Sequence, residues 1–138
     1  MTAPTIETRI WLALKSRIES LPLAYDKAWP AEMYQPDATK PFLRIGKVQT
    51  APVRQMIADG NPHERSGSLI VTLVHPLGYP VTVFEQLQGQ IAEHFKDGTR
   101  MTYAGLCVSV PSYPHCIEGY LDNGWWNAPV NIPWRCFA

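Results

Sequence analysis

The sequence is poor in charge of either sign. Only 17% of its 138 residues are charged, and 12 Lys and Arg residues balance 12 Asp and Glu residues. A strongly basic surface is the usual mark of a nucleic-acid-binding domain, so specific nucleic-acid binding is not expected. Hydrophobic residues make up 46% of the chain, which is too many for a chain that stays unfolded.

Long apolar runs and a targeting segment are also missing. The longest apolar runs, such as residues 11–14, are far shorter than the roughly 20 residues that span a bilayer. Residues 1–5 contain no basic stretch followed by an apolar one, which a signal peptide requires. We therefore expect no membrane partner and residence in the cytoplasm.

Cysteine is scarce. Cys107, Cys116 and Cys136 are too few to form a disulfide framework, and none lies in a Cys-x-x-Cys motif. We expect free thiols in a reducing compartment. Cys107 and Cys116 fall in strand-like segments, where we expect them to be buried.

Motifs of catalysis or metal binding are lacking. His63, His75, His94 and His115 lie in four separate segments, and no two have the i, i+4 spacing of a helical zinc site. We expect turn or surface histidines, no metal ion and no cofactor. No nucleophile elbow, Walker loop or dinucleotide fingerprint is present. A small enzyme using a histidine or cysteine remains an alternative.

Proline is abundant, with 13 residues, and it excludes long uninterrupted helices. Two segments still have helical periodicity. The first runs from residue 6 until Pro22 stops it, and the second from about Val81 to Phe95. The apolar stripe of the first is Ile6, Ile10, Leu14, Ile18 and Leu21; that of the second is Val83, Phe84, Leu87, Ile91 and Phe95. Gln88 is assigned to the wet face of the second helix.

Extended segments occupy much of the rest. We predict strands at residues 42–50, 66–75, 100–103, 106–110 and 125–137, and a short one at 23–25. The order predicts a single α+β domain over residues 1–138, with a mostly antiparallel sheet and two helices packed on it.

The last predicted strand carries two kinds of information. Its alternation places Trp126 and Trp134 on one apolar face, so both are expected in the core. Pro129 and Pro133 are an even number of residues apart, so their missing N–H groups lie on the same side. Because only the other side keeps its donors, we expect an edge strand.

A long connection, residues 51–65, joins two predicted strands. It is longer than a plain hairpin turn and holds few residues able to fill a core, so we predict a protein interface there, although a loop without any role is the alternative. Tryptophan is enriched at interfaces, which adds one residue from the last strand. The predicted interface comprises Arg54, Asp59, His63, Glu64, Arg65 and Trp125.

Several motifs follow one another in a distinctive order. Pro41-Phe42-Leu43-Arg44 comes first, then a strand from Arg65 to His75-Pro76-x-Gly78, then a helix ending Phe95-x-x-Gly98-Thr99-Arg100. The most specific piece closes the chain: Gly124-Trp125-Trp126-x-x-Pro129-Val130-x-Ile132-Pro133-Trp134-Arg135. Over nearly its whole length the sequence resembles the tail terminator (tail completion) proteins of long-tailed bacteriophages and prophages, related to the lambda tail terminator.

The resemblance implies a structural role without catalytic residues or cofactor. Such proteins form a hexameric ring that caps the tail tube, stops its polymerisation and offers a surface to the head. The implied partners are further copies of the chain, the tail tube protein and the head-side connector protein, with only transient, non-specific contact to passing DNA. The implied location is the virion tail, reached from the host cytoplasm. The alternatives are a neck or head-completion protein and a tube-like subunit.

Overall fold

The first helix forms as its periodicity predicts. The computed structural model describes residues 5–54 and 63–138, so Asp59 lies outside the described residues. Helix α1 (Ile6–Glu19) begins after Thr5, whose side chain accepts a hydrogen bond from the Thr8 amide. Its buried residues are Ile10, Ala13, Leu14 and Ile18, which confirms the predicted stripe.

The second helix differs from the prediction at one residue. Helix α2 (Val81–His94) buries Phe84, Ile91 and also Gln88, which is 5% exposed. The Gln88 side-chain amide donates to the carbonyl oxygens of Ile117 and Pro129, both at 2.9 Å. The prediction that Gln88 faces water is wrong: one turn beyond Phe84, it lies on the buried side of the helix.

The strands form one sheet in the order β1-β2-β4-β9-β6-β5, with β3 also paired to β4, and β7 and β8 to β9. Every pair is antiparallel except β1–β2. The strands are β1 (Asp26–Ala28), β2 (Phe42–Gln49), β3 (Val53–Arg54), β4 (His63–Pro76), β5 (Arg100–Tyr103), β6 (Leu106–Ser109), β7 (His115–Cys116), β8 (Tyr120–Asp122) and β9 (Trp125–Phe137). The α+β fold with a mostly antiparallel sheet is confirmed, while β1 begins after the predicted segment 23–25.

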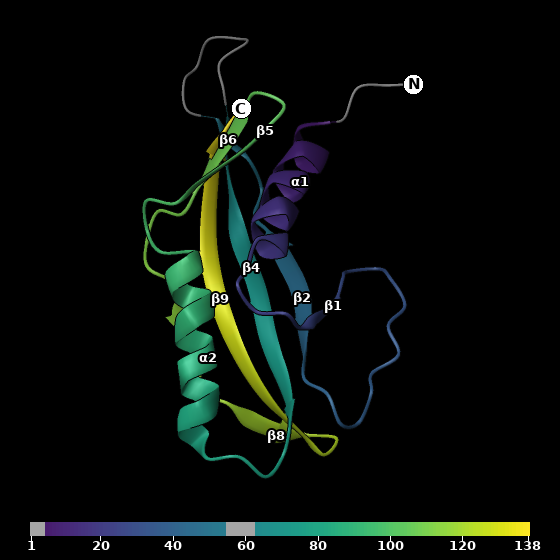
Figure 1. Cartoon of the computed structure of the whole chain (residues 1–138). Helices are drawn as coiled ribbons and strands as arrows, with labels where there is room; N and C mark the ends of the chain where they lie inside the picture. Colours follow the sequence, from purple (N-terminus) through teal and green to yellow (C-terminus); the bar gives the residue numbers. More distant parts are fainter. Residues whose placement is uncertain (1–4, 55–62) are drawn as a thin grey trace.

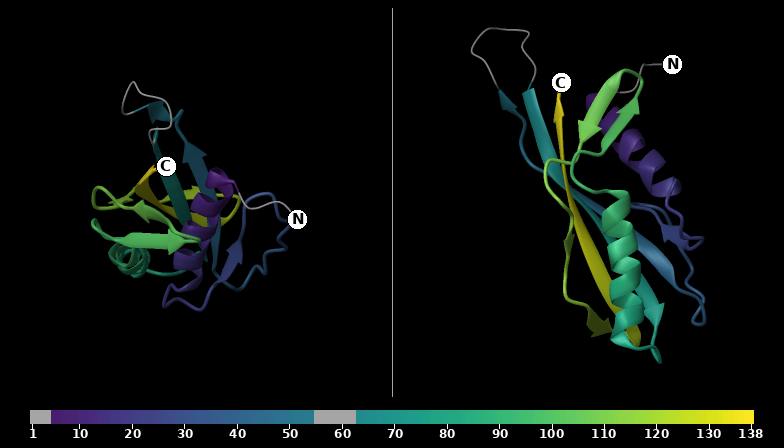
Figure 2. Two further views of the ribbon diagram at one scale, coloured as in Figure 1. Left: turned by 90° about the horizontal axis from the view of Figure 1, so that it is seen from above. Right: turned by 60° about the vertical axis from the view of Figure 1, so that its left-hand side comes forward.

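Both helices cover the same face of the sheet (Figures 1 and 2). The buried side chains of α1 and α2 form one core with alternate residues of the central strands. From the sheet this core takes Leu43, Ile45, Leu69, Val71, Leu73, Ala128, Val130, Ile132 and Trp134. Trp134 is 2% exposed, and half-buried Trp126 stacks on Phe84 at 5.8 Å between ring centroids. The predicted inward face of the last strand is confirmed.

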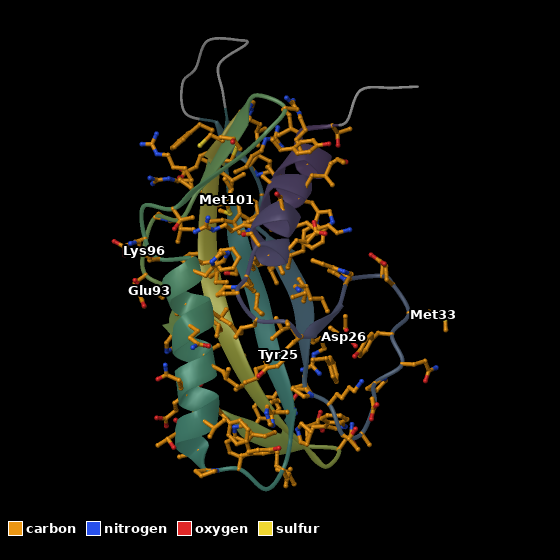
Figure 3. The ribbon with its side chains drawn as sticks, viewed as in Figure 1. Tyr25, Asp26, Met33, Glu93, Lys96 and Met101 are labelled. Atoms are coloured by element: carbon orange, nitrogen blue, oxygen red, sulfur yellow. The ribbon has the colours of Figure 1, made fainter. Side chains whose placement is uncertain are left out.

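The connection from β1 to β2 projects from the edge of the sheet. Its Met33 side chain is 95% exposed and points away from the body of the molecule (Figure 3). The next residue anchors the connection: the Tyr34 hydroxyl donates to Asp26 at 3.3 Å, and its ring packs on Phe42 at 4.9 Å.

Strand β9 is central, so the prediction of an edge strand is wrong. It pairs with β4 along its whole length and, on the other side, with β8, β7 and β6 in turn. The carbonyl of Pro129 accepts the Ile117 amide at 2.9 Å, so this proline does face away from β4, as predicted. On this side β8 pairs with residues 125–127, β7 with residues 130–131 and β6 with residue 135. The two unpaired intervals between these strands contain Pro129 and Pro133.

Candidate assembly surfaces

Four of the six predicted interface residues come together at one end of the sheet. Arg54 pairs with His63 and Val53 with Glu64, so the predicted connection is a hairpin at its base. The backbone of His63 also exchanges two hydrogen bonds with Ala138, at 3.0 and 2.9 Å.

Arg65 joins three parts of this end. Its guanidinium forms an ion pair with Glu7 of α1 and donates through Nε to the Ala138 oxygen at 3.4 Å. The side chain is only 14% exposed. Arg65 therefore fastens α1 and the end of β9 to β4, and its role at an interface stays a prediction.

Trp125 lies far from these residues, at the opposite end of β9 (Figure 1). The twelve-residue separation from Phe137 corresponds to about 40 Å along the strand. Trp125 is half-buried, and its ring meets Phe42 edge-on at 5.6 Å. The structure does not bring Trp125 together with the other predicted residues.

A cleft of about 470 Å³, here called the arginine cleft, opens where α1, the β5–β6 hairpin and the end of β9 meet. Arg9, Arg100 and Arg135 line it, and no Asp or Glu side chain does. The other lining residues are Gly105, Leu106, Cys107, Ser109, Cys136, Phe137 and Ala138.

The arginines of this cleft are incompletely satisfied. Arg9 donates from Nη1 to the Ala104 carbonyl at 3.5 Å, and Arg135 lies over the Phe137 ring at 5.3 Å. The Nε atoms of Arg9 and Arg135 are buried without an acceptor among the described residues. The sequence analysis missed this cleft because its arginines come from three distant segments, and no local pattern connects them.

A second cleft, here called the acidic cleft, lies between α2 and the segment that contains β7. Its volume is about 230 Å³, and Glu85 and Glu118 line it without any Lys or Arg. Neither glutamate forms an ion pair within the described parts of the chain. The other lining residues are Val81, Phe84, Gln88, Cys116, Ile117, Gly119 and Trp126.

Each cleft contains one exposed cysteine. Cys107 lines the arginine cleft and Cys116 the acidic cleft, so the prediction that both are buried is wrong. In β6 the alternation buries Leu106 and Val108 and turns Cys107 outward. All three cysteines are unpaired with one another in the structure. Desolvation raises the pKa of Cys116, which keeps its thiol protonated and weakly nucleophilic near neutral pH.

His75 is buried, against the prediction of a turn or surface position. The residue is 6% exposed, and the rings of Tyr79 and Phe84 lie edge-on to its imidazole, with centroids at 4.7 and 5.1 Å. Within residues 5–54 and 63–138 no group of three His, Cys, Asp or Glu residues could hold a metal ion.

His94 belongs to a clamp between the helix ends. Its Nε2 lies 2.9 Å from the Arg17 carbonyl and 3.0 Å from the Ser20 hydroxyl. In return, the Arg17 guanidinium donates to the His94 carbonyl at 3.1 and 2.7 Å. Desolvation lowers the pKa of His94, so the clamp contains a neutral imidazole near neutral pH.

Comparison with known proteins identifies the family. A sequence model of the family described as phage tail terminator protein matches residues 9–134. One solved structure, whose name states no function, has the same fold with a TM-score of 0.76 and 20% identity, covering 96% of each chain. No curated protein matched the sequence. The motifs that resembled this family lie, from Pro41 to Trp134, within the matched range, and the chain belongs to the phage tail terminator protein family.

Proposed function

We propose that several copies of this protein form a ring on the end of the phage tail tube. The ring stops further polymerisation of the tube and provides the surface to which the head is joined. Its partners are neighbouring copies, the tail tube protein and the head-side connector protein. DNA passes through the ring with only transient, non-specific contact.

The observation that carries this proposal is the family match across residues 9–134. Membership makes the protein a structural component of the phage tail. The two clefts add support, because each presents charge that the described part of the subunit does not neutralise. Such surfaces suit a protein whose work is to bind other proteins.

The hairpin between β3 and β4 is proposed to contact a neighbouring subunit or the tube. Arg54, His63, Glu64 and Arg65 lie at its base, and Asp59 lies outside the described residues. Replacing residues 54–61 by a short Gly-Ser linker is expected to leave the melting temperature of the isolated protein nearly unchanged. The same change is expected to abolish control of tail length.

The direct test deletes the coding sequence from the phage that encodes the chain and supplies the chain in trans. We expect overlong tails or heads without tails after deletion, and tails of uniform, normal length after complementation, seen by negative-stain microscopy. Normal joined tails in the deletion strain would overturn the proposal. Gold labelling at the head vertex, or along the whole tube, would favour a neck protein or a tube subunit instead.

A further inference from the structure

The arginine cleft and the acidic cleft carry opposite charges, and each lacks the counter-charge that the other offers. We propose that the arginine cleft of one copy binds carboxylates of the acidic cleft of the next copy; this inference rests on the ring described under the proposed function. The contact joins Arg9, Arg100 and Arg135 on one side to Glu85 and Glu118 on the other.

The arginine cleft carries positive charge that the described part of the subunit does not neutralise. Arg65, at the same end, is already satisfied by Glu7 and Ala138. Arg9 and Arg135 each keep a buried Nε without an acceptor in residues 5–54 and 63–138. Arg100 is exposed and makes no ion pair with the described residues. Arginine–carboxylate pairs are among the strongest hydrogen-bonded ion pairs, and planar guanidinium groups suit a carboxylate well.

Apolar surface borders both clefts. Phe137, which is 52% exposed, lines the arginine cleft, and Val81, which is 48% exposed, lines the acidic cleft. Leu121, in β8 beside Trp126, is 60% exposed. Aromatic, aliphatic and arginine side chains in one surface are typical of protein interfaces, whereas a site for the phosphates of passing DNA needs no apolar border.

One subunit cannot bring its own two clefts together. Trp126 lines one and Arg135 the other, and they are nine residues, about 30 Å, apart along β9. A contact between two different surfaces is heterologous, so it repeats from copy to copy and closes into a ring when the rotation permits. Because the chain has 12 basic and 12 acidic residues, such a ring gains no net charge from the pairing.

The native cysteines give a direct test. Cys107 and Cys116 are exposed in the two clefts. Within one chain the two cysteines are far apart. Cys116 pairs with Val130 of β9, and Ser109, two residues after Cys107, pairs with Arg135. These two positions of β9 are five residues, or about 17 Å, apart. A short bismaleimide, added to assembled tails at a mildly alkaline pH that ionises the Cys116 thiol, should therefore link Cys107 of one copy to Cys116 of the next and give a ladder of oligomers on a denaturing gel.

Matched variants identify the linked residues. Cys107→Ser and Cys116→Ser should each abolish the ladder, whereas Cys136→Ser, at a buried position, should leave it unchanged. No ladder from the wild-type tails, or a ladder that survives Cys107→Ser or Cys116→Ser, would overturn the proposal.

Charge reversal tests the contact independently. Arg100→Glu and Glu118→Arg should each abolish complementation of the deleted phage, and the double variant should restore it, because the exchanged charges again attract. Lys40→Glu, at an exposed loop position, makes the same change in net charge and should complement normally. Normal complementation by both single variants, or none by the double variant, would overturn the proposed contact.

The outcomes separate this inference from the proposed function. If the wild-type protein controls tail length and Arg100→Glu and Glu118→Arg do as well, the proposed contact between the clefts is wrong and the proposed function stands. If the wild-type protein does not control tail length, the proposed function is wrong. Tails of normal length that fail to pass DNA in Arg100→Glu alone would show that the cleft binds phosphate, which would also overturn the contact.

Discussion

The two sides of β9 are built differently. On one side, all 13 residues of the strand have a partner in β4. On the other, three short strands pair with it in separate places, and Pro129 and Pro133 mark the gaps. One side is a continuous ladder of backbone hydrogen bonds and the other is a segmented one.

A side chain supplies a donor that the segmented side lacks. Pro129 has no N–H to offer, and the amide of Gln88 in α2 donates instead to the carbonyl of Ile117, the residue whose own amide binds Pro129. Proline on one side of a strand therefore did not produce an edge. It determined where the partner strand is interrupted, and at Pro129 a side chain of α2 supplies the missing donor.

The largest effect is expected from Gly67→Ala on the continuous side. A Cβ atom at Gly67 would collide with the Val48 carbonyl and lie 2.8 Å from Cζ2 of Trp134. Because the Val48 backbone of β2, which is paired with β4, must then move, we expect a loss of about 4 kcal/mol or more in the free energy of unfolding. Urea denaturation would measure it.

Two glycines serve as controls for that change. At Gly119, between β7 and β8, the three atoms nearest to an added Cβ all belong to the Trp126 side chain, so Gly119→Ala should cost less than a change that strikes the backbone. Gly89→Ala, with no atom within 4 Å, should stabilise α2 by about 0.5–1 kcal/mol. Equal losses in the free energy of unfolding for Gly67→Ala and Gly119→Ala would show that the two sides of β9 do not differ in this way.

The two inward tryptophans of β9 should come next. Trp134→Ala removes a fully buried ring, and we expect a loss of about 3–5 kcal/mol in the free energy of unfolding. Trp126→Ala should lose clearly less, since the ring is half-buried at the segmented end. Thermal melting of both variants tests the order, and a larger loss for Trp126→Ala would reverse it.

Gln88→Ala should destabilise only the segmented side of β9. It leaves the Ile117 and Pro129 carbonyls without their side-chain donor, at a cost of about 1–3 kcal/mol. Hydrogen exchange should become faster at the Ile117 amide than in wild type, with β4 unchanged. Gln90→Ala, exposed on the same helix, is the control, and faster exchange throughout β4 would contradict the prediction.

The smallest effect concerns pH. Burial lowers the pKa of His94 in the folded protein, so the unfolded chain takes up this proton at a higher pH. Stability should therefore fall as pH drops through the ordinary histidine pKa of about 6.5 towards the lower folded value. His94→Gln should show a smaller loss of melting temperature between neutral and mildly acidic pH. An unchanged pH dependence would show that the clamp between the helix ends does not titrate.

Local patterns explain what the sequence could predict. Helical periodicity and Pro22 located both helices, the extended segments 100–103 and 106–110 anticipated β5 and β6, and the predicted segment 125–137 coincides with β9. The strands β7 and β8 have two and three residues, too few for any periodicity, so β9 was expected to lie at an edge. Gln88 was misplaced because polarity alone assigned it to water.

The clefts depend on strand order rather than on local pattern. Arg9, Arg100 and Arg135 meet only because β9 lies beside β6, and Glu85 meets Glu118 only because β7 packs under α2. The hairpin base at Arg54 and His63 was predictable since its strands are close in sequence. Trp125 was added to the predicted interface only because tryptophan is common at interfaces.

The central position of β9 also affects how the chain folds during synthesis. β9 follows every other strand in the sequence, so β4 emerges from the ribosome with one side unpaired. An unpaired strand edge is a template for aggregation, and pairings between distant segments form slowly. The sheet, and with it both clefts, therefore cannot be completed until residues 125–137 have been translated, and until then the edge of β4 stays open to aggregation.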